Sequence, residues 1–245
     1  MDVTVGIDLA AEPPGTAVAA IRWGAGRAVV DEVVTRADDE TVLRWMRHPG
    51  GAIGIDCPFG WPVAFVQLVA DHGDRTLRTP TNRSDGWRRE YVLRETDLHV
   101  QATTGLRPLS VAADYIGHVA IRLAALISEL GPGVDSSLDG SGAIAETYPA
   151  AALKTWGLPH RGYKGAAHQA ARDVIVDSLA VAAPWLDLGS HEQAARDSDH
   201  VLDAVLCALV ARARHRGLTE LPSDVALARR EGWIHVPTGS LADLP

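Results

Sequence analysis

The 245-residue sequence predicts an α/β protein in which helices flank a mixed β-sheet. Three strand-like apolar runs come first, and later strand-like runs alternate with stretches of helical periodicity, which is the order expected of such a sheet. Apolar residues make up 47% of the chain, enough to form a core of its own. Because the chain shows no repeat and no long low-complexity linker, we expect a single domain over residues 1–245.

The first half of the chain is expected to supply four strands and one helix. The strands are expected at 3–9, 16–23, 27–35 and 52–56, where β-branched and other apolar residues run together. A turn at Gly24-Ala25-Gly26 joins the second and third strands, and Pro58 halts the fourth. Asp38 or Asp39 is suited to cap a helix that ends near Pro49.

The second half is expected to be mainly helical. An irregular polar region covers 73–90, and apolar residues then recur at helical spacing over 111–130. A loop rich in Gly, Ser and Asp precedes a strand at 143–148, which Pro149 closes. Further helices are expected at 166–182 and 199–216, followed by a last strand at 233–236.

Acidic residues end three of the predicted strands. Asp8 follows Val5-Gly6-Ile7, Asp56 follows Ile53-Gly54-Ile55, and Glu146 follows Ala143-Ile144-Ala145. In open α/β sheets, functional sites form at the carboxyl ends of parallel strands. If these three strands are parallel, their carboxylates meet at one edge of the sheet.

The helix at 199–216 adds a fourth acid. From Val201 to Ala211 every residue is apolar except Asp203, so we expect the helix to be buried nearly all round and to carry Asp203 with it. An unpaired buried carboxylate costs roughly several kcal/mol, so Asp203 needs a partner. Asp199 lies four residues earlier, on the same face of the helix.

Clustered carboxylates repel one another, and a bound cation relieves that repulsion. Because the donors are oxygens, with no clustered His or Cys, Mg²⁺ or Mn²⁺ is favoured over Zn²⁺. The predicted ligands are Asp8, Asp56, Asp199 and Asp203, and Glu146 completes the site. The alternative is that each acid is structural, because a strand-end Asp often caps a turn and Asp203 can accept hydrogen bonds from a neighbouring loop.

Composition limits the classes of partner. The net charge is −8, from 31 acidic and 23 basic residues, so a nucleic-acid partner would need a local basic patch or a bound cation. Cys57 and Cys207 lie in apolar runs and are expected to be buried thiols. The sequence shows no signal peptide and no apolar run of the ~18 residues that a membrane span needs, so we expect a cytoplasmic protein.

Two basic segments are candidates for phosphate contact. Over 83–94, arginines interleave with Trp87 and Tyr91; nucleic-acid-binding proteins show this pattern, and so does an arginine-rich solvated helix. Arg161 and Lys164 lie in a glycine-flanked loop before a helix, where a phosphate would gain from backbone donors, although the loop can equally be an ordinary connection. His200 lies next to Asp199 and is the histidine of interest here.

Several short motifs are distributed over nearly the whole chain. They are Gly6-Ile7-Asp8, Gly54-Ile55-Asp56-Cys57-Pro58-Phe59-Gly60, Arg94-Glu95-Thr96-Asp97, Glu146-Thr147-Tyr148-Pro149, Tyr163-Lys164, Asp199-His200-Val201-Leu202-Asp203-Ala204 and Glu231-Gly232-Trp233-Ile234. In this order they resemble the landmarks of the domain-of-unknown-function 429 family, whose members are catalogued as predicted nucleases of ribonuclease H-like fold. The predicted strand order is also that of ribonuclease H-like proteins.

The resemblance implies a ribonuclease H-like mixed sheet with helical insertions and a carboxylate metal site. By position, Asp8, Asp56, Glu146 and Asp203 would be its catalytic ligands, and Asp199 a substitute or extra ligand. The resemblance also marks Arg94 and Asp97 as candidates for substrate binding, beside Lys164 of the glycine-flanked loop. Arg94 and Asp97 stand at i,i+3 spacing, so the alternative is that they pair with each other.

The leading hypothesis is a divalent-metal-dependent phosphodiesterase that acts on a nucleic acid or a small phosphodiester, with Lys164 or Arg94 steadying the phosphate. A noncatalytic binding module that keeps the fold without the chemistry is a second hypothesis, and the negative charge favours it. A third is an actin-like nucleotide phosphotransferase, because residues 8–16 loosely resemble the first phosphate loop of that class. Such proteins pair two domains, for which this chain is short. The three hypotheses predict different results. The phosphodiesterase should bind metal and hydrolyse its substrate, the binding module should bind a partner without metal, and the phosphotransferase should bind ATP.

Overall fold

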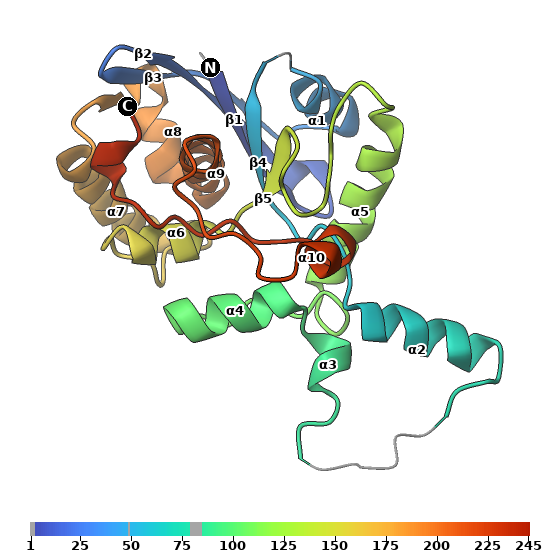
Figure 1. Cartoon of the computed structure of the whole chain (residues 1–245). Helices are drawn as coiled ribbons and strands as arrows, with labels where there is room; N and C mark the ends of the chain where they lie inside the picture. Colours follow the sequence, from blue (N-terminus) through green and yellow to red (C-terminus); the bar gives the residue numbers. More distant parts are fainter. Residues whose placement is uncertain (1–2, 49, 79–84) are drawn as a thin grey trace.

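A mixed β-sheet forms the centre of the protein in the computed structural model, which describes residues 3–48, 50–78 and 85–245 (Figure 1). Within these residues the sheet has six strands in the order β5-β4-β1-β2-β3-β6. Their bounds are Val3–Asp8 (β1), Ala17–Gly24 (β2), Arg27–Thr35 (β3), Ala52–Asp56 (β4), Ile144–Glu146 (β5) and Leu186–Asp187 (β6). The predicted α/β class is confirmed, and the short β6 is an addition.

The direction of the strands decides which ends meet. β1 and β2 are antiparallel, as are β2 and β3, whereas β4 runs parallel to β1 and β5 runs parallel to β4. The edge strand β6 runs parallel to β3. The carboxyl ends of β1, β4 and β5 therefore lie at one edge of the sheet. This is the condition under which the acids that end these strands were expected to meet.

Helix α9 (Asp199–His215) crosses one face of the sheet and packs against β1, β4 and β2. Its residues from Val201 to Ala211 are all buried, as their apolar sequence predicted. Two strand glycines permit this approach. A Cβ atom at Gly6 would lie 1.8 Å from the carbonyl oxygen of Ala204, and one at Gly54 would lie 2.4 Å from that of Cys207. The helix backbone thus rests directly on the sheet.

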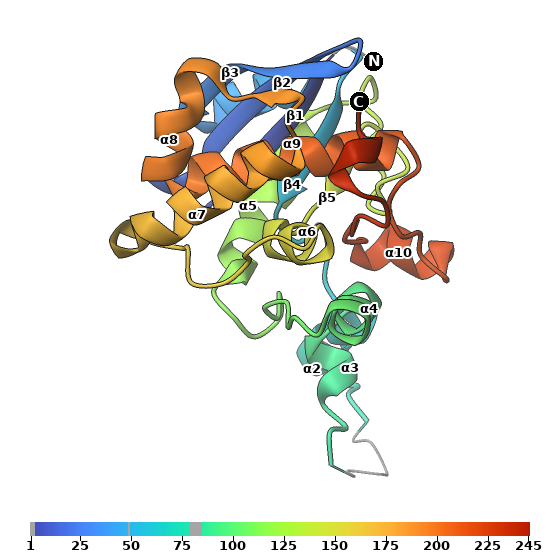
Figure 2. The same ribbon diagram turned by 90° about the vertical axis from the view of Figure 1, so that its left-hand side faces the viewer.

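Helices cover both faces of the sheet. Together with α9, α6 (Pro149–Thr155) and α7 (Gln169–Ala182) contribute to one apolar cluster with residues of β2 such as Ile21. On the other face, α1 (Asp39–Met46) and α5 (Ile116–Glu129) pack against residues of β1 such as Ile7. Figure 2 shows α7, α8 (Glu192–Asp197) and α9 grouped on one side of the strands.

Several predicted boundaries shift for local reasons. Asp38 caps α1 by accepting a hydrogen bond from the Thr41 backbone N–H at 2.9 Å. The strand expected at 143–148 ends at Glu146, because Pro149 occupies the first turn of α6. The strand expected at 233–236 is reduced to an isolated parallel bridge between Ile234 and Glu146. The helix expected over 111–130 begins only at Ile116.

A helical insertion extends from the carboxyl edge of the sheet. It contains α2 (Val63–Gly73), α3 (Arg89–Val92) and α4 (Glu95–Thr104), and Figures 1 and 2 show α2 and α3 pointing away from the sheet. The sequence pattern did not predict α2, none of whose residues is buried. Part of the region expected to be irregular, residues 79–84, lies outside the described residues. A last helix, α10 (Val225–Glu231), lies near this insertion.

Two simpler expectations concern cysteines and membranes. Cys57 and Cys207 are both free and buried, as predicted. Across the part of the chain that the structure describes, no helix combines the length and the apolar character that crossing a membrane requires.

Candidate metal centre

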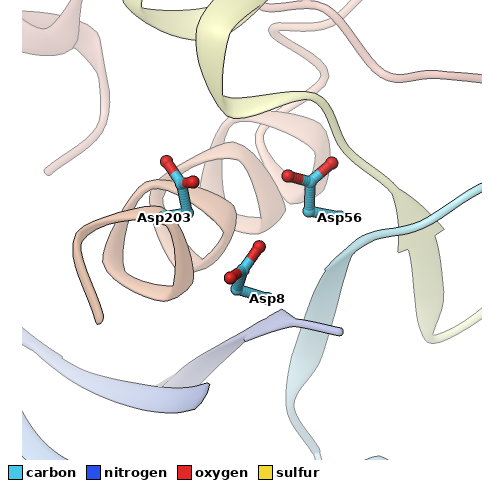
Figure 3. Close-up of side chains that lie close together, drawn as sticks. All are labelled: Asp8, Asp56 and Asp203. Atoms are coloured by element: carbon cyan, nitrogen blue, oxygen red, sulfur yellow. The ribbon is translucent and has the colours of Figure 1, made fainter. Parts of the chain in front are cut away.

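Three aspartates from separate elements converge at the carboxyl edge of the sheet. Asp8 ends β1, Asp56 ends β4, and Asp203 lies one turn inside α9 (Figure 3). Each offers a carboxylate oxygen, and these oxygens all lie within 4.8 Å of one another. Asp8 and Asp203 are buried, whereas Asp56 is partly exposed. The structure therefore brings together three of the predicted ligands.

Strand register and the strand glycines explain this convergence. Asp8 and Asp56 are register partners on adjacent parallel strands, so their side chains lie on the same face of the sheet. Gly6 and Gly54 lie two residues earlier in each strand and share that face. Because α9 contacts the sheet at these glycines, Asp203 comes within reach of both strand-end carboxylates.

Asp203 is held by two neighbours from one loop. The Tyr163 hydroxyl donates to Asp203 Oδ1 at 2.9 Å, and the Lys164 ammonium contacts Asp203 Oδ2. Burial raises the pKa of Asp203 to about 6, although the Lys164 ammonium opposes that shift and Asp8 adds to it. The Lys164 side chain as a whole remains half exposed.

Asp56 is the least compensated of the three carboxylates. Burial raises its pKa well above the ordinary value, and the negative charges of Asp8 and Asp203 raise it further, against the opposing effect of Lys164. Across the described residues, no group donates a hydrogen bond to the Asp56 side chain. A carboxylate in this position needs positive charge nearby to remain ionised.

His200 contacts the third carboxylate. Its Nδ1 lies 2.6 Å from Asp8 Oδ2, and this hydrogen bond raises the pKa of His200 against the opposing effect of burial. The His200 side chain is 43% exposed. His200 therefore lies between Asp8 and the solvent at the rim of the site.

The loop that carries Lys164 is anchored by an arginine that sequence reasoning did not single out. The buried Arg172 guanidinium of α7 donates to the carbonyl oxygens of Tyr163 at 2.8 Å and Gly165 at 2.7 Å. Asp199 adds a further restraint, because its Oδ2 accepts from the Gly165 N–H at 3.0 Å. The only sequence feature that could have indicated a buried role for Arg172 is its position in a segment whose apolar residues recur at helical spacing. Asp199 lies outside the three-aspartate group, and its role as a ligand stays a prediction.

Glu146 also lies outside the three-aspartate group. Its register partner on β4 is Ile55, not Asp56. Because side chains alternate along a strand, Glu146 points to the face opposite Asp56. There Glu146 Oε2 accepts from the Phe59 N–H at 3.0 Å, and both oxygens accept from Arg94. A catalytic role for Glu146 stays a prediction that this placement does not favour.

Arg94 is fully occupied by protein partners. Its guanidinium donates five hydrogen bonds: two to Asp97, two to Glu146 and one to the Glu231 carbonyl oxygen. Arg94, Asp97 and Glu146 are each buried. The ion pair of Arg94 with Asp97 at i,i+3, which the sequence left as an alternative, is present at 2.9 Å. Substrate binding by Arg94 and Asp97 stays a prediction, whereas Lys164 faces the site.

Among the described residues, the other basic candidates make no hydrogen bond or ion pair with the three aspartates. Arg88 stacks over Trp87 at 5.5 Å, and Trp87 meets Tyr91 edge to face, next to and within α3 of the helical insertion. Arg83 of the same predicted cluster lies outside the described residues. Arg161 is exposed in the loop before Lys164.

A cavity of about 240 Å³ opens beside the carboxylates. Asp56 and Lys164 line it on the polar side. Arg94 and Glu146 also line it, already paired with each other. The apolar lining includes Pro58, Pro108, Leu109, Ile116 and Tyr148.

The donor set fits a hard divalent cation. All three groups supply carboxylate oxygens, which Mg²⁺ and Mn²⁺ prefer, and their mutual spacing suits one shared ion. The raised pKa values of Asp56 and Asp203 show that burial and mutual repulsion disfavour their ionised forms. A bound cation would supply the missing charge.

No curated protein and no solved structure matches the chain significantly. One family model matches residues 6–226, and its description reads "Protein of unknown function (DUF429)". The match includes Asp8, Asp56 and Asp203, and it covers most of the sheet and the whole of α9. The chain therefore belongs to the domain-of-unknown-function 429 family, as its motifs had indicated.

Proposed function

We propose that this protein is a divalent-metal-dependent phosphodiesterase, with Asp8, Asp56 and Asp203 as the ligands of Mg²⁺ or Mn²⁺. The observation that carries the proposal is the convergence of three carboxylate oxygens within 4.8 Å at a partly open sheet edge. A structural role explains each aspartate alone. It does not explain why three of them meet with one exposed lysine, leaving Asp56 without a hydrogen-bond donor among the described residues.

Hydrolysis requires a new bond between phosphorus and a water oxygen and cleavage of the ester P–O bond, after which the leaving oxygen takes up a proton. When bound, the cation supplies Lewis-acid polarisation of the phosphate and lowers the pKa of water. The chain's own groups orient the participants. Tyr163 holds the Asp203 carboxylate at 2.9 Å, and Lys164, which lines the neighbouring cavity, would donate to a phosphate oxygen.

His200 is suited to proton exchange at the rim. It is hydrogen-bonded to Asp8 and 43% exposed, so it can pass a proton between the site and solvent. Glu146, Arg94 and Asp97 act in this proposal as positioning residues. Their buried network joins β5 to the start of α4 and supports the wall of the cavity beside Asp56.

The test is hydrolysis of bis(p-nitrophenyl) phosphate and of short DNA and RNA oligonucleotides with Mn²⁺ or Mg²⁺. We expect Asp8→Asn and Asp56→Asn to lose both hydrolysis and metal binding measured by calorimetry. The control is Asp31→Asn, because Asp31 is exposed on β3 and pairs with Arg22. Equal hydrolysis by wild type and Asp8→Asn would refute the catalytic assignment. Metal binding without hydrolysis of any substrate would favour the noncatalytic binding module.

A further inference from the structure

The cavity beside Asp56 is lined by both polar and apolar residues, and the metal centre alone does not explain the apolar ones. Two of its polar lining residues, Asp56 and Lys164, belong to the candidate metal centre, Asp56 as one of the three aspartates and Lys164 through its contact with Asp203. Its apolar lining includes Pro58, Pro108 and Leu109, together with Ile116 at the start of α5. A phosphate at the carboxylates would therefore have an apolar space next to one of its ester substituents.

The polar groups inside the cavity are mostly engaged already. Arg94 and Glu146 bond to each other, and the Thr147 hydroxyl donates to Cys207 Sγ at 3.1 Å. Among the described residues, none accepts from or donates to the Tyr148 hydroxyl. A ligand in this cavity would thus meet apolar walls and one free phenol, which suits a flat ring with a single polar edge.

The volume of the cavity is sufficient for one ring system. An apolar cavity of ~150 Å³ holds a benzene molecule. The present cavity, at about 240 Å³, has room for a somewhat larger ring system such as a single base. Leu109 stands at the cavity with 61% of its surface exposed, and covering it would give a ring additional apolar contact.

The charge around the cavity disfavours a long nucleic acid. A polynucleotide is usually held by a row of cations along its backbone. Of the two cations that line this cavity, Arg94 is fully occupied and only Lys164 is exposed. The net charge of −8 would also repel a chain of phosphates.

We propose that this cavity binds a single aromatic or heteroaromatic ring esterified to the substrate phosphate, so that the substrate is a small phosphodiester and not a long nucleic acid. The inference rests on the proposed function, because it places the phosphate at the three aspartates. It assigns Leu109, Ile116 and Tyr148 as residues that determine specificity.

The test compares two phosphate probes, phenyl phosphate and methyl phosphate, by calorimetry with Mn²⁺ present. We expect wild type to bind phenyl phosphate at least about tenfold more tightly, because even one methylene in an apolar pocket gives that ratio. Both probes carry the same phosphate, so the ratio of their affinities reports the cavity alone. Neither measurement requires turnover.

Two variants with matched controls locate the effect. Ile116→Trp should fill the cavity and bring the two affinities to about equality, whereas Ile121→Trp, on the same helix and 64% exposed, should not. Leu109→Ser should reduce the preference by roughly fivefold, since a half-exposed side chain contributes part of the apolar contact. Leu221 is 76% exposed and lies outside this cavity, so Leu221→Ser should leave the preference for phenyl phosphate unchanged. Methyl phosphate should bind all four variants as it binds wild type.

The outcomes separate the two proposals. Equal binding of the two probes to wild type, or a preference that survives in Ile116→Trp, overturns the ring-binding cavity and leaves the metal-dependent hydrolase standing. If neither probe binds in the presence of Mn²⁺, the phosphate site is refuted and the inference falls with it. Displacement of phenyl phosphate by single-stranded oligothymidylate at lower concentration than by a dinucleotide would overturn the small-ester assignment in favour of a nucleic acid.

Discussion

Gly54 lies so close to Cys207 that a Cβ atom on the glycine would stand 2.4 Å from the carbonyl oxygen of Cys207. Cys207 follows Asp203 by one helical turn, and Asp56 follows Gly54 by two residues. The distance between helix and strand at this contact therefore sets the distance between two of the three aspartates. A small residue in the sheet is thus part of the candidate metal centre.

Gly54→Ala should disturb both the fold and the metal site. The added methyl group forces α9 away from β4, and overpacking of this kind costs about 3 kcal/mol. Denaturant unfolding measures the loss of stability, and calorimetry with Mn²⁺ measures the loss of binding. Gly133→Ala is the control, because a Cβ atom there meets nothing within 4 Å. Full stability and binding in Gly54→Ala would show that the contact does not set the site.

Arg94→Met should destabilise the protein strongly. The change leaves Glu146 and Asp97 buried without their cation, which costs about 3–5 kcal/mol. The matched control is Arg22→Met, which breaks an ion pair with Asp31 whose two side chains are more than half exposed, so water screens the pair and its loss should change the stability little. Urea unfolding curves of both variants provide the comparison. Equal stability losses in the two would contradict the buried network.

A buried histidine should make the fold sensitive to acid. Burial lowers the pKa of His235 to about 4, and its two ring nitrogens are engaged with the Thr219 hydroxyl and the Asp139 carbonyl. The folded state disfavours the protonated ring, whereas the unfolded chain takes up a proton at His235 near pH 6.5. The contribution of neutral His235 to the stability of the fold is therefore complete above pH 6.5 and is lost as the pH falls from about 6.5 towards 4.

The measurement is the free energy of unfolding across that pH range. His235→Gln should weaken the pH dependence between 6.5 and 4, whereas His72→Gln, at an exposed position on α2, should keep it. An unchanged pH dependence in His235→Gln would assign the acid sensitivity to other groups.

Protons should compete with the metal at the three aspartates. Burial raises the pKa of Asp203 to about 6, so a cation must displace a proton from this carboxyl group at lower pH. Mn²⁺ affinity should therefore fall by up to about tenfold per pH unit below that pKa, since ligands must be deprotonated to bind. Calorimetry at pH 7.5 and pH 5 tests this. A pH-independent affinity would exclude Asp203 as a ligand.

Sequence patterns were sufficient for the central part of the fold. The apolar runs that form β1 and β4 end in Asp8 and Asp56, and a helix apolar on all sides around Asp203 had to be buried. These predictions depend on local composition and periodicity, which a sequence carries directly. The sequence did not indicate helix α2, because its apolar residues follow no clear helical period. Consistent with this, none of its residues is buried.

What the sequence by itself determined was the presence of carboxylates at strand ends and of one acid in a buried helix. Only the tertiary structure decided which of them meet. Glu146 ends its strand as Asp8 and Asp56 do, yet its register places it opposite Ile55 and turns its carboxylate to Arg94 on the other face. A shift of one residue in register reverses the face of a side chain, and register depends on contacts between strands distant in sequence. The sequence also marked Lys164 as a candidate, but its contact with Asp203, like that of Tyr163, depends on the packing of a loop that Arg172 anchors.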